Sequence, residues 1–278
     1  MFKNSFFIIL FFTLSFGINA TQSLAQSRLS IGDQHTVYSD ILEQDRRILV
    51  GLPRNYTEDK NYPVLYLLDG EEYYQMAQGI LDFLHNRANS IPEVILVAIP
   101  NIYRNTDLTP VYEPGDPNAH TIEYSGGANQ FIKFLKHELQ PFIVDRYSTS
   151  GNNILFGHSL AGLFAAHTFL EDPSLFNHYV ISDPSLWYGE GMLIRKIAAN
   201  KTSLYALRKT IYLTQIDRSN DEDDIMSKPQ DDFMAQLSGV TNIASSKILI
   251  PNESHDTVPL KSLYQGLLSI FKEYEHPQ

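Results

Sequence analysis

The sequence of 278 residues contains no cysteine. Disulfide bonds, thiolate zinc sites and cysteine nucleophiles are therefore excluded, and any catalytic nucleophile must use another group. Positive charge is also scarce, because 21 Lys and Arg residues stand against 32 Asp and Glu residues, for a formal net charge of −11. An acidic protein repels phosphate groups, so the composition argues against binding to nucleic acid or to an anionic membrane surface.

Long apolar runs are missing except near the start of the chain. Residues 6–16 form an apolar run behind Lys3, and two small-residue cleavage sites follow, ending at Ala20 and Ala25, of which the second fits the usual pattern better. This run is too short for a bilayer, which requires about 20 residues, and the pattern is typical of a secretory signal peptide. We expect residues 1–25 to be a signal peptide and the mature protein to be exported, to the periplasm or the medium, without stable membrane insertion. The alternative is an uncleaved N-terminal anchor.

The remaining residues 26–278 predict one α/β domain. Hydrophobic residues make up 43% of the chain, enough for one large core. Short apolar runs typical of buried strands alternate with helical patterns, which indicates a mostly parallel central sheet with helices on both faces. The strands are expected at 62–68, 94–100, 153–156, 179–182, 210–215 and 247–251, and the helices at 71–85, 128–146, 160–170, 192–199, 230–237 and 258–274. Residues 35–53 predict a hairpin at the sheet edge, and the long polar segment 101–124 is expected to form a wall of the active site.

One strand-to-helix junction has the pattern of a catalytic serine. Residues 157–162 read Gly-His-Ser-Leu-Ala-Gly, after an expected strand and before an expected helix. This context is typical of a nucleophile elbow, in which a sharp turn exposes the hydroxyl, here that of Ser159. Ala161 stands where the usual pattern has glycine. The alternative interpretation is an ordinary glycine-rich turn.

A serine hydroxyl needs a neighbouring base to accept its proton. In α/β-hydrolases the base is a histidine after the last strand, and the chain order is serine, acid, histidine. Of the nine histidines, His255 fits both the order and the position. His158, beside the serine, is expected to pack rather than to act as the base.

The third member of a triad is harder to assign. It is expected in the acidic loop after strand 210–215, where Asp221 is the first candidate and Asp217 and Asp223 are close alternatives. Glu253 could orient His255 from its own loop. Two other possibilities stay open: the acidic loop simply faces solvent, or a Ser–His pair works without an acid.

An oxyanion hole requires backbone amides aimed at the developing negative charge. One amide is expected from Leu160, directly after the serine, and the other from Gly70 or Glu71, after strand 62–68. A plain β-to-α turn is the alternative role of that second segment. This chemistry requires no metal and no cofactor, and only a small-molecule ester as partner.

The motifs together resemble the putative-esterase family of α/β-hydrolases, and within it most resemble siderophore trilactone esterases of the IroE and BesA type. The resemblance covers nearly the whole mature chain and rests on residues 39–42, 46–47, 52–56, 66–70, 104–110, 125–128, 157–162, 183–187 and 253–255. It implies an α/β-hydrolase fold with Ser159 as nucleophile and His255 as base. The likeness to members near the salmochelin hydrolase also implies that no acid is strongly placed, in agreement with the ambiguity of the third member.

The resemblance implies an ester hydrolase that could act on siderophores. Arg104 and Asp107, in segment 101–124, are candidates for binding the substrate, since a guanidinium suits an anionic or catecholate group. The alternative is a salt bridge between these two residues. Trp187 would form an apolar wall of the site, or else be a buried structural residue. Acyl transfer, feruloyl or acetyl ester hydrolysis and a non-catalytic ligand-binding module remain competing functions, and the oligomeric state is not predicted.

Overall fold

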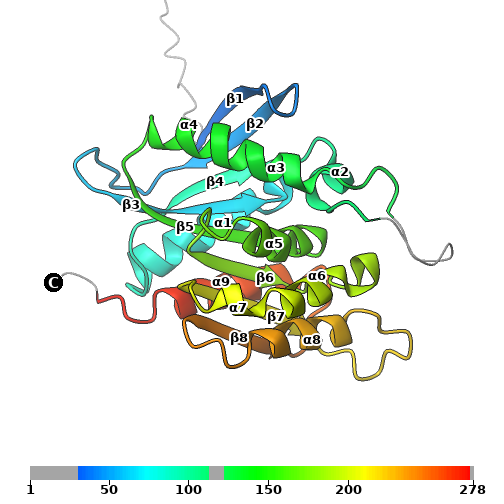
Figure 1. Cartoon of the computed structure of the whole chain (residues 1–278). Helices are drawn as coiled ribbons and strands as arrows, with labels where there is room; N and C mark the ends of the chain where they lie inside the picture. The colour runs from blue at the N-terminus through cyan, green and yellow to red at the C-terminus, as the bar shows by residue number, and fades with distance from the viewer. Residues whose placement is uncertain (1–30, 113–121, 276–278) are drawn as a thin grey trace, which may run out of the picture. The chain divides into compact units, whose positions relative to one another are not determined.

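A single sheet of eight strands lies at the centre of the computed structural model, which describes residues 31–112 and 122–275 (Figure 1). The strand order is β1-β2-β4-β3-β5-β6-β7-β8. Strands β3 to β8 run parallel where they pair, whereas β2 is antiparallel to both of its neighbours. The strands span Asp33–Ser39, Gln44–Gly51, Tyr62–Leu68, Ile95–Ile99, Thr149–His158, His178–Ser182, Lys209–Ile216 and Ile243–Ile250, in chain order. The predicted mostly parallel sheet is confirmed.

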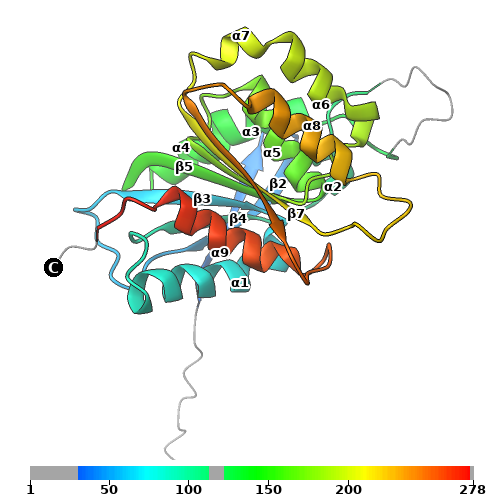
Figure 2. The ribbon, with the colours of Figure 1, turned by 90° about the horizontal axis from the view of Figure 1, so that it is seen from below.

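Helices cover both faces of this sheet, as predicted (Figure 2). α1 (Gly70–Asp82) and α9 (Val258–Ile270) pack on one face. The opposite face carries α2 (Arg104–Leu108), α3 (Ala128–Phe134), α4 (Gln140–Val144), α5 (Leu160–Glu171), α6 (Tyr188–Ala199), α7 (Lys201–Leu204) and α8 (Ser227–Leu237). A π-helical turn, Phe83–Arg87, extends α1. Within the described residues, no helix is both long and apolar enough to cross a membrane.

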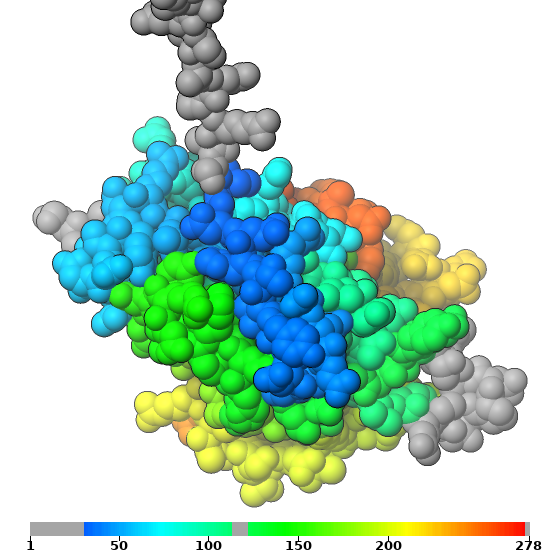
Figure 3. Space-filling model, turned by 90° about the horizontal axis from the view of Figure 1, so that it is seen from above, coloured from blue at the N-terminus to red at the C-terminus, as the bar shows by residue number. Residues whose placement is uncertain are grey.

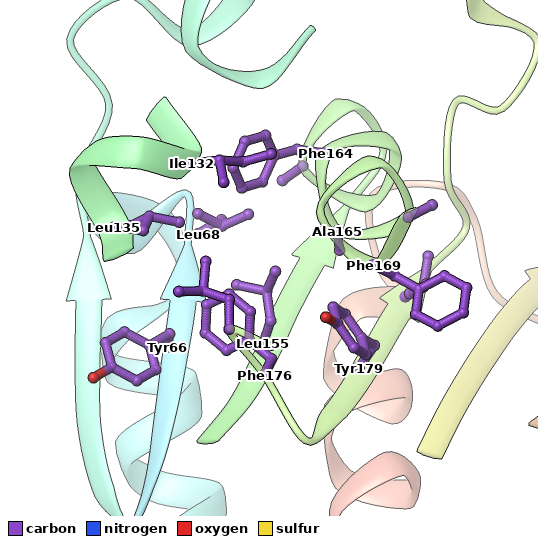
Figure 4. Packing of buried hydrophobic residues seen from close by; sticks show 14 of the residues in the cluster. Tyr66, Leu68, Ile132, Leu135, Leu155, Phe164, Ala165, Phe169, Phe176 and Tyr179 are labelled. Carbon is purple, nitrogen blue, oxygen red and sulfur yellow. The ribbon is translucent and has the colours of Figure 1, made fainter. Parts of the chain in front are cut away.

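Strand β3 shows why its sequence is a continuous apolar run. Tyr66 and Leu68 face the layer of α3 and α5, whereas Leu65 and Leu67 face α1 and α9. Successive side chains of a strand point to opposite faces, so a strand covered on both sides must be apolar at every position. Figure 4 shows Tyr66 and Leu68 on the α3–α5 side, with Leu155 of the neighbouring strand β5.

The helix predicted over 128–146 is interrupted. It consists of α3, a π-helical turn over Leu135–Leu139, and α4, which ends at Val144. Pro141 stands at the start of α4 and has no amide proton for the helical hydrogen bond to the preceding turn. The wider turn therefore lies where the proline disturbs the hydrogen-bond pattern, near the predicted interruption.

The N-terminal hairpin forms one edge of the sheet. Strands β1 and β2 pair in antiparallel register from Asp33 opposite Val50 to Ser39 opposite Gln44. Figure 3 shows this blue hairpin lying across the surface of the molecule. The edge hairpin predicted over 35–53 is thus confirmed. The expected signal peptide and residues 113–121 of segment 101–124 lie outside the described residues.

A buried ion pair joins this hairpin to α2. Nη1 of Arg46 in β2 lies 2.8 Å from Oδ2 of Asp107, and both side chains are buried. Phe131 and Phe134 cover the guanidinium, with ring centroids 5.1 and 5.7 Å away. Burial raises the pKa of Asp107, although the nearby Arg46 opposes this effect. The pair fixes the start of segment 101–124 to the sheet.

Replacing Arg46 with alanine is expected to destabilise the protein by about 3–5 kcal/mol, because Asp107 is left as an unpaired buried carboxylate. The neighbouring Arg47 is exposed, so Arg47→Ala is the matched control and should change stability by about 0.5 kcal/mol or less. Urea unfolding followed by circular dichroism measures both variants. Equal midpoints for the two would show that the buried pair does not stabilise the fold.

Candidate active site

Ser159 lies between the end of β5 and the start of α5, on a turn that few non-glycine residues adopt. Its backbone has φ 58° and ψ −116°, a conformation that is strained for a residue with a side chain. The turn brings strand and helix so close that a Cβ atom on Gly157 would lie 2.1 Å from the carbonyl oxygen of Ala161. Ala161 is fully buried, so the residue that replaces the usual glycine fits the turn. The predicted strand–turn–helix geometry is confirmed.

The imidazole of His255 lies between a hydroxyl and a carboxylate. Its Nε2 atom is 3.0 Å from Oγ of Ser159, and its Nδ1 atom is 2.6 Å from Oδ2 of Asp183. His255 follows β8, as predicted, and Asp183 directly follows β6 and is completely buried. In such an arrangement the imidazole can accept the hydroxyl proton while the carboxylate keeps the other ring nitrogen protonated.

The carboxylate that contacts Nδ1 of His255 does not come from the predicted loop after β7. Asp221, the first candidate, is exposed, and its Oδ1 atom accepts a hydrogen bond from the amide of Asp223, 3.1 Å away. Asp217 likewise accepts from the amide of Ser219, at 2.9 Å. These short side chains bond to the amide two residues ahead and so shape the turns of their own loop. The assignment of Asp221 is wrong, because Asp183 occupies the Nδ1 side of the imidazole.

Glu253 does not orient the imidazole either, since its Oε1 atom pairs with Nζ of Lys261 at 2.7 Å. Asp183 was not predicted as the acid, because the usual order in α/β-hydrolases placed the acid after the strand at 210–215. A signal for it was present: it directly follows the expected strand 179–182 and falls between Ser159 and His255 in the chain. The alternative of a Ser–His pair without a carboxylate also disagrees with the geometry.

Two further side chains hold Asp183. Arg218 donates from Nη1 to Oδ1 at 2.9 Å and from Nη2 to Oδ2, and Nε2 of Gln230 donates to Oδ1 at 3.2 Å. Burial by itself would raise the pKa of Asp183, but the hydrogen bonds from His255 and Arg218 outweigh it and hold that pKa well below its ordinary value. Asp183 is therefore ionised at neutral pH.

His158 packs against the site, as predicted. Its Nδ1 atom is 3.1 Å from the hydroxyl of Tyr73, and its ring centroid is 4.4 Å from that of His255. Burial, together with the nearby His255, lowers the pKa of His158 to about 4. The side chain is therefore neutral at neutral pH and adds no charge beside His255.

The predicted oxyanion amides lie at one edge of the sheet. β3 and β5 are parallel neighbours with Leu67 opposite Phe156, so α1 and α5 begin at the same edge of the sheet, on its two opposite faces. The first amides of a helix have no partner within it and can donate to a ligand. Leu160 is the first residue of α5, and Gly70 and Glu71 are the first two of α1. Their use as oxyanion donors stays a prediction.

Arg104 pairs with a different carboxylate from the one expected. Its Nε and Nη2 atoms donate to the two oxygens of Asp69 at 2.7 and 2.9 Å, and Nδ2 of Asn101 donates to the same group at 2.6 Å. The alternative of an Arg104–Asp107 salt bridge is wrong, because Asp107 is bound to Arg46. The prediction that Asp107 binds substrate is wrong for the same reason: its carboxylate is buried and already paired.

Arg104 also lines a pocket of about 480 Å³ beside α2, together with Tyr103, Asn105, Thr106 and Tyr124. Both tyrosine side chains are exposed. An aromatic ring could therefore stack here close to a guanidinium. The contact of Arg104 with a substrate stays a prediction.

The segment after Asp183 contacts the nucleophile directly. Oγ of Ser185 lies 3.2 Å from Oγ of Ser159, and the amide of Ser185 donates to the carbonyl of Ser159 at 3.0 Å. Trp187, two residues later, is half-buried and packs against the core. Its role as an apolar wall for substrate stays a prediction.

In the part of the chain that the structure describes, no three His, Asp or Glu side chains are placed to hold a metal ion. The two buried carboxylates at this edge, Asp69 and Asp183, each face an arginine instead. The chemistry available from this chain is that of a hydroxyl, an imidazole and a carboxylate in hydrogen-bond contact.

Several curated relatives of the chain are named siderophore esterases. It is 30% identical over 151 residues to the siderophore enterobactin esterase of Emericella nidulans (49% of this chain, 50% of that protein). It is 28% identical over 163 residues to the ferri-bacillibactin esterase BesA of Bacillus subtilis (54% and 56%). The chain thus matches about half the length of these relatives.

Solved structures resemble the chain over more of its length. An IroE-like serine hydrolase from Shewanella oneidensis superposes with a TM-score of 0.77 at 27% identity, covering 88% of this chain and 81% of that one. The BES protein from Bacillus cereus also reaches 0.77, at 25% identity, covering 90% and 98%. The fold is therefore that of an α/β-hydrolase. The family model for "Putative esterase" matches residues 39–245, and the chain belongs to this family.

Proposed function

We propose that the protein is an exported serine esterase that hydrolyses carboxylic esters, with siderophore esters as its substrate class. The observation that carries this proposal is the hydrogen-bonded series from Ser159 through His255 to Asp183. Membership of the esterase family and the names of the relatives support the same reaction.

The reaction begins at the serine hydroxyl. Oγ of Ser159 attacks the ester carbonyl carbon while Nε2 of His255 accepts the hydroxyl proton. Asp183 accepts a hydrogen bond from Nδ1 of the imidazole, which fixes the tautomer with a free Nε2 and stabilises the imidazolium that forms. The three groups already lie in hydrogen-bond contact, so little reorganisation precedes the attack.

The attack leaves a negative charge on the former carbonyl oxygen. The amides of Leu160 and of Gly70 or Glu71 would donate to this oxygen from the first turns of α5 and α1. The positive ends of the two helix dipoles add to the stabilisation. Collapse of the intermediate expels the alcohol, which takes its proton from His255 and leaves an acyl group on Ser159.

Hydrolysis of the acyl-enzyme reverses these roles. His255 takes a proton from water, the resulting hydroxide attacks the acyl carbonyl, and Ser159 leaves with the proton held by the imidazole. The products are one carboxylic acid and one alcohol for each water consumed. An alcohol in place of water would make the enzyme an acyltransferase, which the product analysis below distinguishes.

The pocket beside α2 suits an aromatic arm that carries acidic hydroxyls. Tyr103 and Tyr124 offer aromatic surface, and Arg104 brings a cation that is one-third exposed while it pairs with Asp69. A catecholate combines a ring with an anionic oxygen, so it matches both features. We place the aromatic arm of the siderophore ester there.

Export rests on the N-terminal pattern of Lys3, the apolar run 6–16 and the small-residue site ending at Ala25. An exported esterase would meet its siderophore in the periplasm or in the medium. Cleavage after Ala25 would leave a mature chain that begins at Gln26.

The purified mature protein is expected to hydrolyse both short aryl esters and a catecholate trilactone, and Ser159→Ala should lower kcat by about 10³-fold or more with an unchanged circular dichroism spectrum. Liquid chromatography of the products, with and without an added alcohol, separates hydrolysis from acyl transfer. A fluorophosphonate probe should label the wild type at Ser159 and not the variant. A protein that neither hydrolyses esters nor takes up the probe would refute the proposed function.

Asp183→Asn is expected to lower kcat by about 10²- to 10⁴-fold, because an amide facing Nδ1 no longer selects the correct tautomer. Asp221→Asn is the matched control, since this exposed carboxylate lies in the β7–α8 loop and accepts a hydrogen bond from the amide of Asp223. Its kcat should stay within about 2-fold of the wild type. Loss of activity in the control with retention in Asp183→Asn would contradict the assignment of the acid.

Expression of the full-length chain in a Gram-negative host should yield a periplasmic or secreted protein whose first residue is Gln26. Intact-mass measurement and N-terminal sequencing of the mature fraction test this. Full-length protein retained in the membrane fraction would favour the alternative of an uncleaved anchor.

A further inference from the structure

We infer that Arg218 is a positioning residue of the reaction: it fixes the orientation of the Asp183 carboxylate and offsets its charge, and so sets the pH range in which His255 acts as a base. This inference rests on the proposed function. Arg218 lies two residues after the end of β7, in the loop where the sequence argument expected the acid itself.

The contact between Arg218 and Asp183 is bidentate. Nη1 and Nη2 of Arg218 each donate to a different oxygen of Asp183, and the arginine side chain is only 9% exposed. Oδ2 is also the acceptor facing His255, and Oδ1 accepts from Gln230. With both oxygens bonded on two sides, the carboxylate plane cannot rotate without breaking a charge-assisted hydrogen bond.

Two neighbouring elements, α8 and β7, also hold Asp183 in place. Gln230 in α8 is completely buried and also donates to the carbonyl of Pro184, at 3.0 Å. The amide of Asp183 donates to the carbonyl of Thr214 in β7 at 2.8 Å. Asp183 has a φ of 41°, a strained value for a non-glycine residue. Side-chain and backbone contacts together therefore hold the carboxylate in one place.

The positive charge has a second effect on the base. A fully buried carboxylate without a cation would attract an imidazolium strongly and favour the protonated form of His255. Arg218 neutralises part of that charge while it keeps Asp183 ionised. Removing Arg218 should consequently shift the acidic limb of the kcat/KM profile to higher pH.

Other ionisable groups around the pair do not replace Arg218. His158 packs on His255 from the end of β5 and is neutral at neutral pH, because burial lowers its pKa to about 4. Asp224 lies on the other side of Arg218, with its Oδ1 atom 3.8 Å from Nε. At the start of α1, Asp69 pairs with Arg104, and Glu72, Tyr73 and Asp256 lie near that pair. Arg218 is thus the cation in direct contact with Asp183 among the described residues.

The test compares Arg218→Gln and Arg218→Lys with the wild type, by kinetics on a soluble aryl ester from pH 5 to 9. Arg218→Gln should lower kcat by about 10- to 100-fold and move the acidic limb up by about 0.5–1 pH unit, with little change in KM. Arg218→Lys retains the charge but cannot form the bidentate hydrogen bond, so it should lower kcat several-fold. The acidic limb of its kcat/KM profile should stay near the wild-type position. Arg54→Gln is the control, because Arg54 also donates to both oxygens of a carboxylate, that of Asp82, but on the exposed surface. The pH profile of this variant should equal that of the wild type.

A second readout needs no substrate. The protonation of His255 is followed by NMR in protein labelled with ¹⁵N-histidine, with the signal assigned by a His255→Gln variant. The same upward shift in Arg218→Gln supports the inference even if no ester is hydrolysed, in which case only the proposed function fails. An unmoved limb and an unmoved NMR titration in a folded Arg218→Gln variant, or a shift to lower pH, would overturn the inference.

Discussion

Parallel pairing of the central strands brings their carboxyl ends to one edge of the sheet, and the site depends on this alignment. His158 lies opposite Ser182, and Ser182 lies opposite Thr214. The residues that follow β5 and β6 are Ser159 and Asp183, and the segment after β8 delivers His255. Residues far apart in the chain therefore meet within hydrogen-bond distance without any long excursion of the backbone.

The same edge carries two buried carboxylates with a common design. Asp69 and Asp183 each follow a strand, each have a positive φ, and each are gripped by an arginine through two hydrogen bonds. One arginine, Arg104, comes from α2, and the other, Arg218, from the loop after β7. Although the chain has a strong excess of acid, both of these carboxylates thus have an arginine beside them, where burial would make a lone carboxylate costly. Asp69 begins the turn with the predicted oxyanion amides, whereas Asp183 faces the base.

Much of this architecture could be predicted from local patterns. The continuous apolar run 62–68 predicted a strand covered on both faces, and the structure confirms it as β3. The helix over 128–146 was predicted with an interruption near Pro141, but the π-helical turn before it was not, because its hydrogen-bond pattern depends on how the chain accommodates the missing amide. The alternative of an ion pair between Arg104 and Asp107 was also wrong. Their spacing suggested a local pair, yet Asp69 and Arg46 compete for them across the fold.

The sequence by itself determined the strand–turn–helix around Ser159 and the place of His255 after the last strand, because both are fixed by short-range chain order and by turn chemistry. Only the tertiary structure decided which carboxylate faces the imidazole. Several acids follow β6 and β7 in the sequence, and hydrophobic periodicity does not distinguish among them. The choice depends on which side chain is buried at the carboxyl edge and which arginine neutralises it there. Both are long-range properties, since Asp183, Arg218 and His255 come from three different segments of the chain.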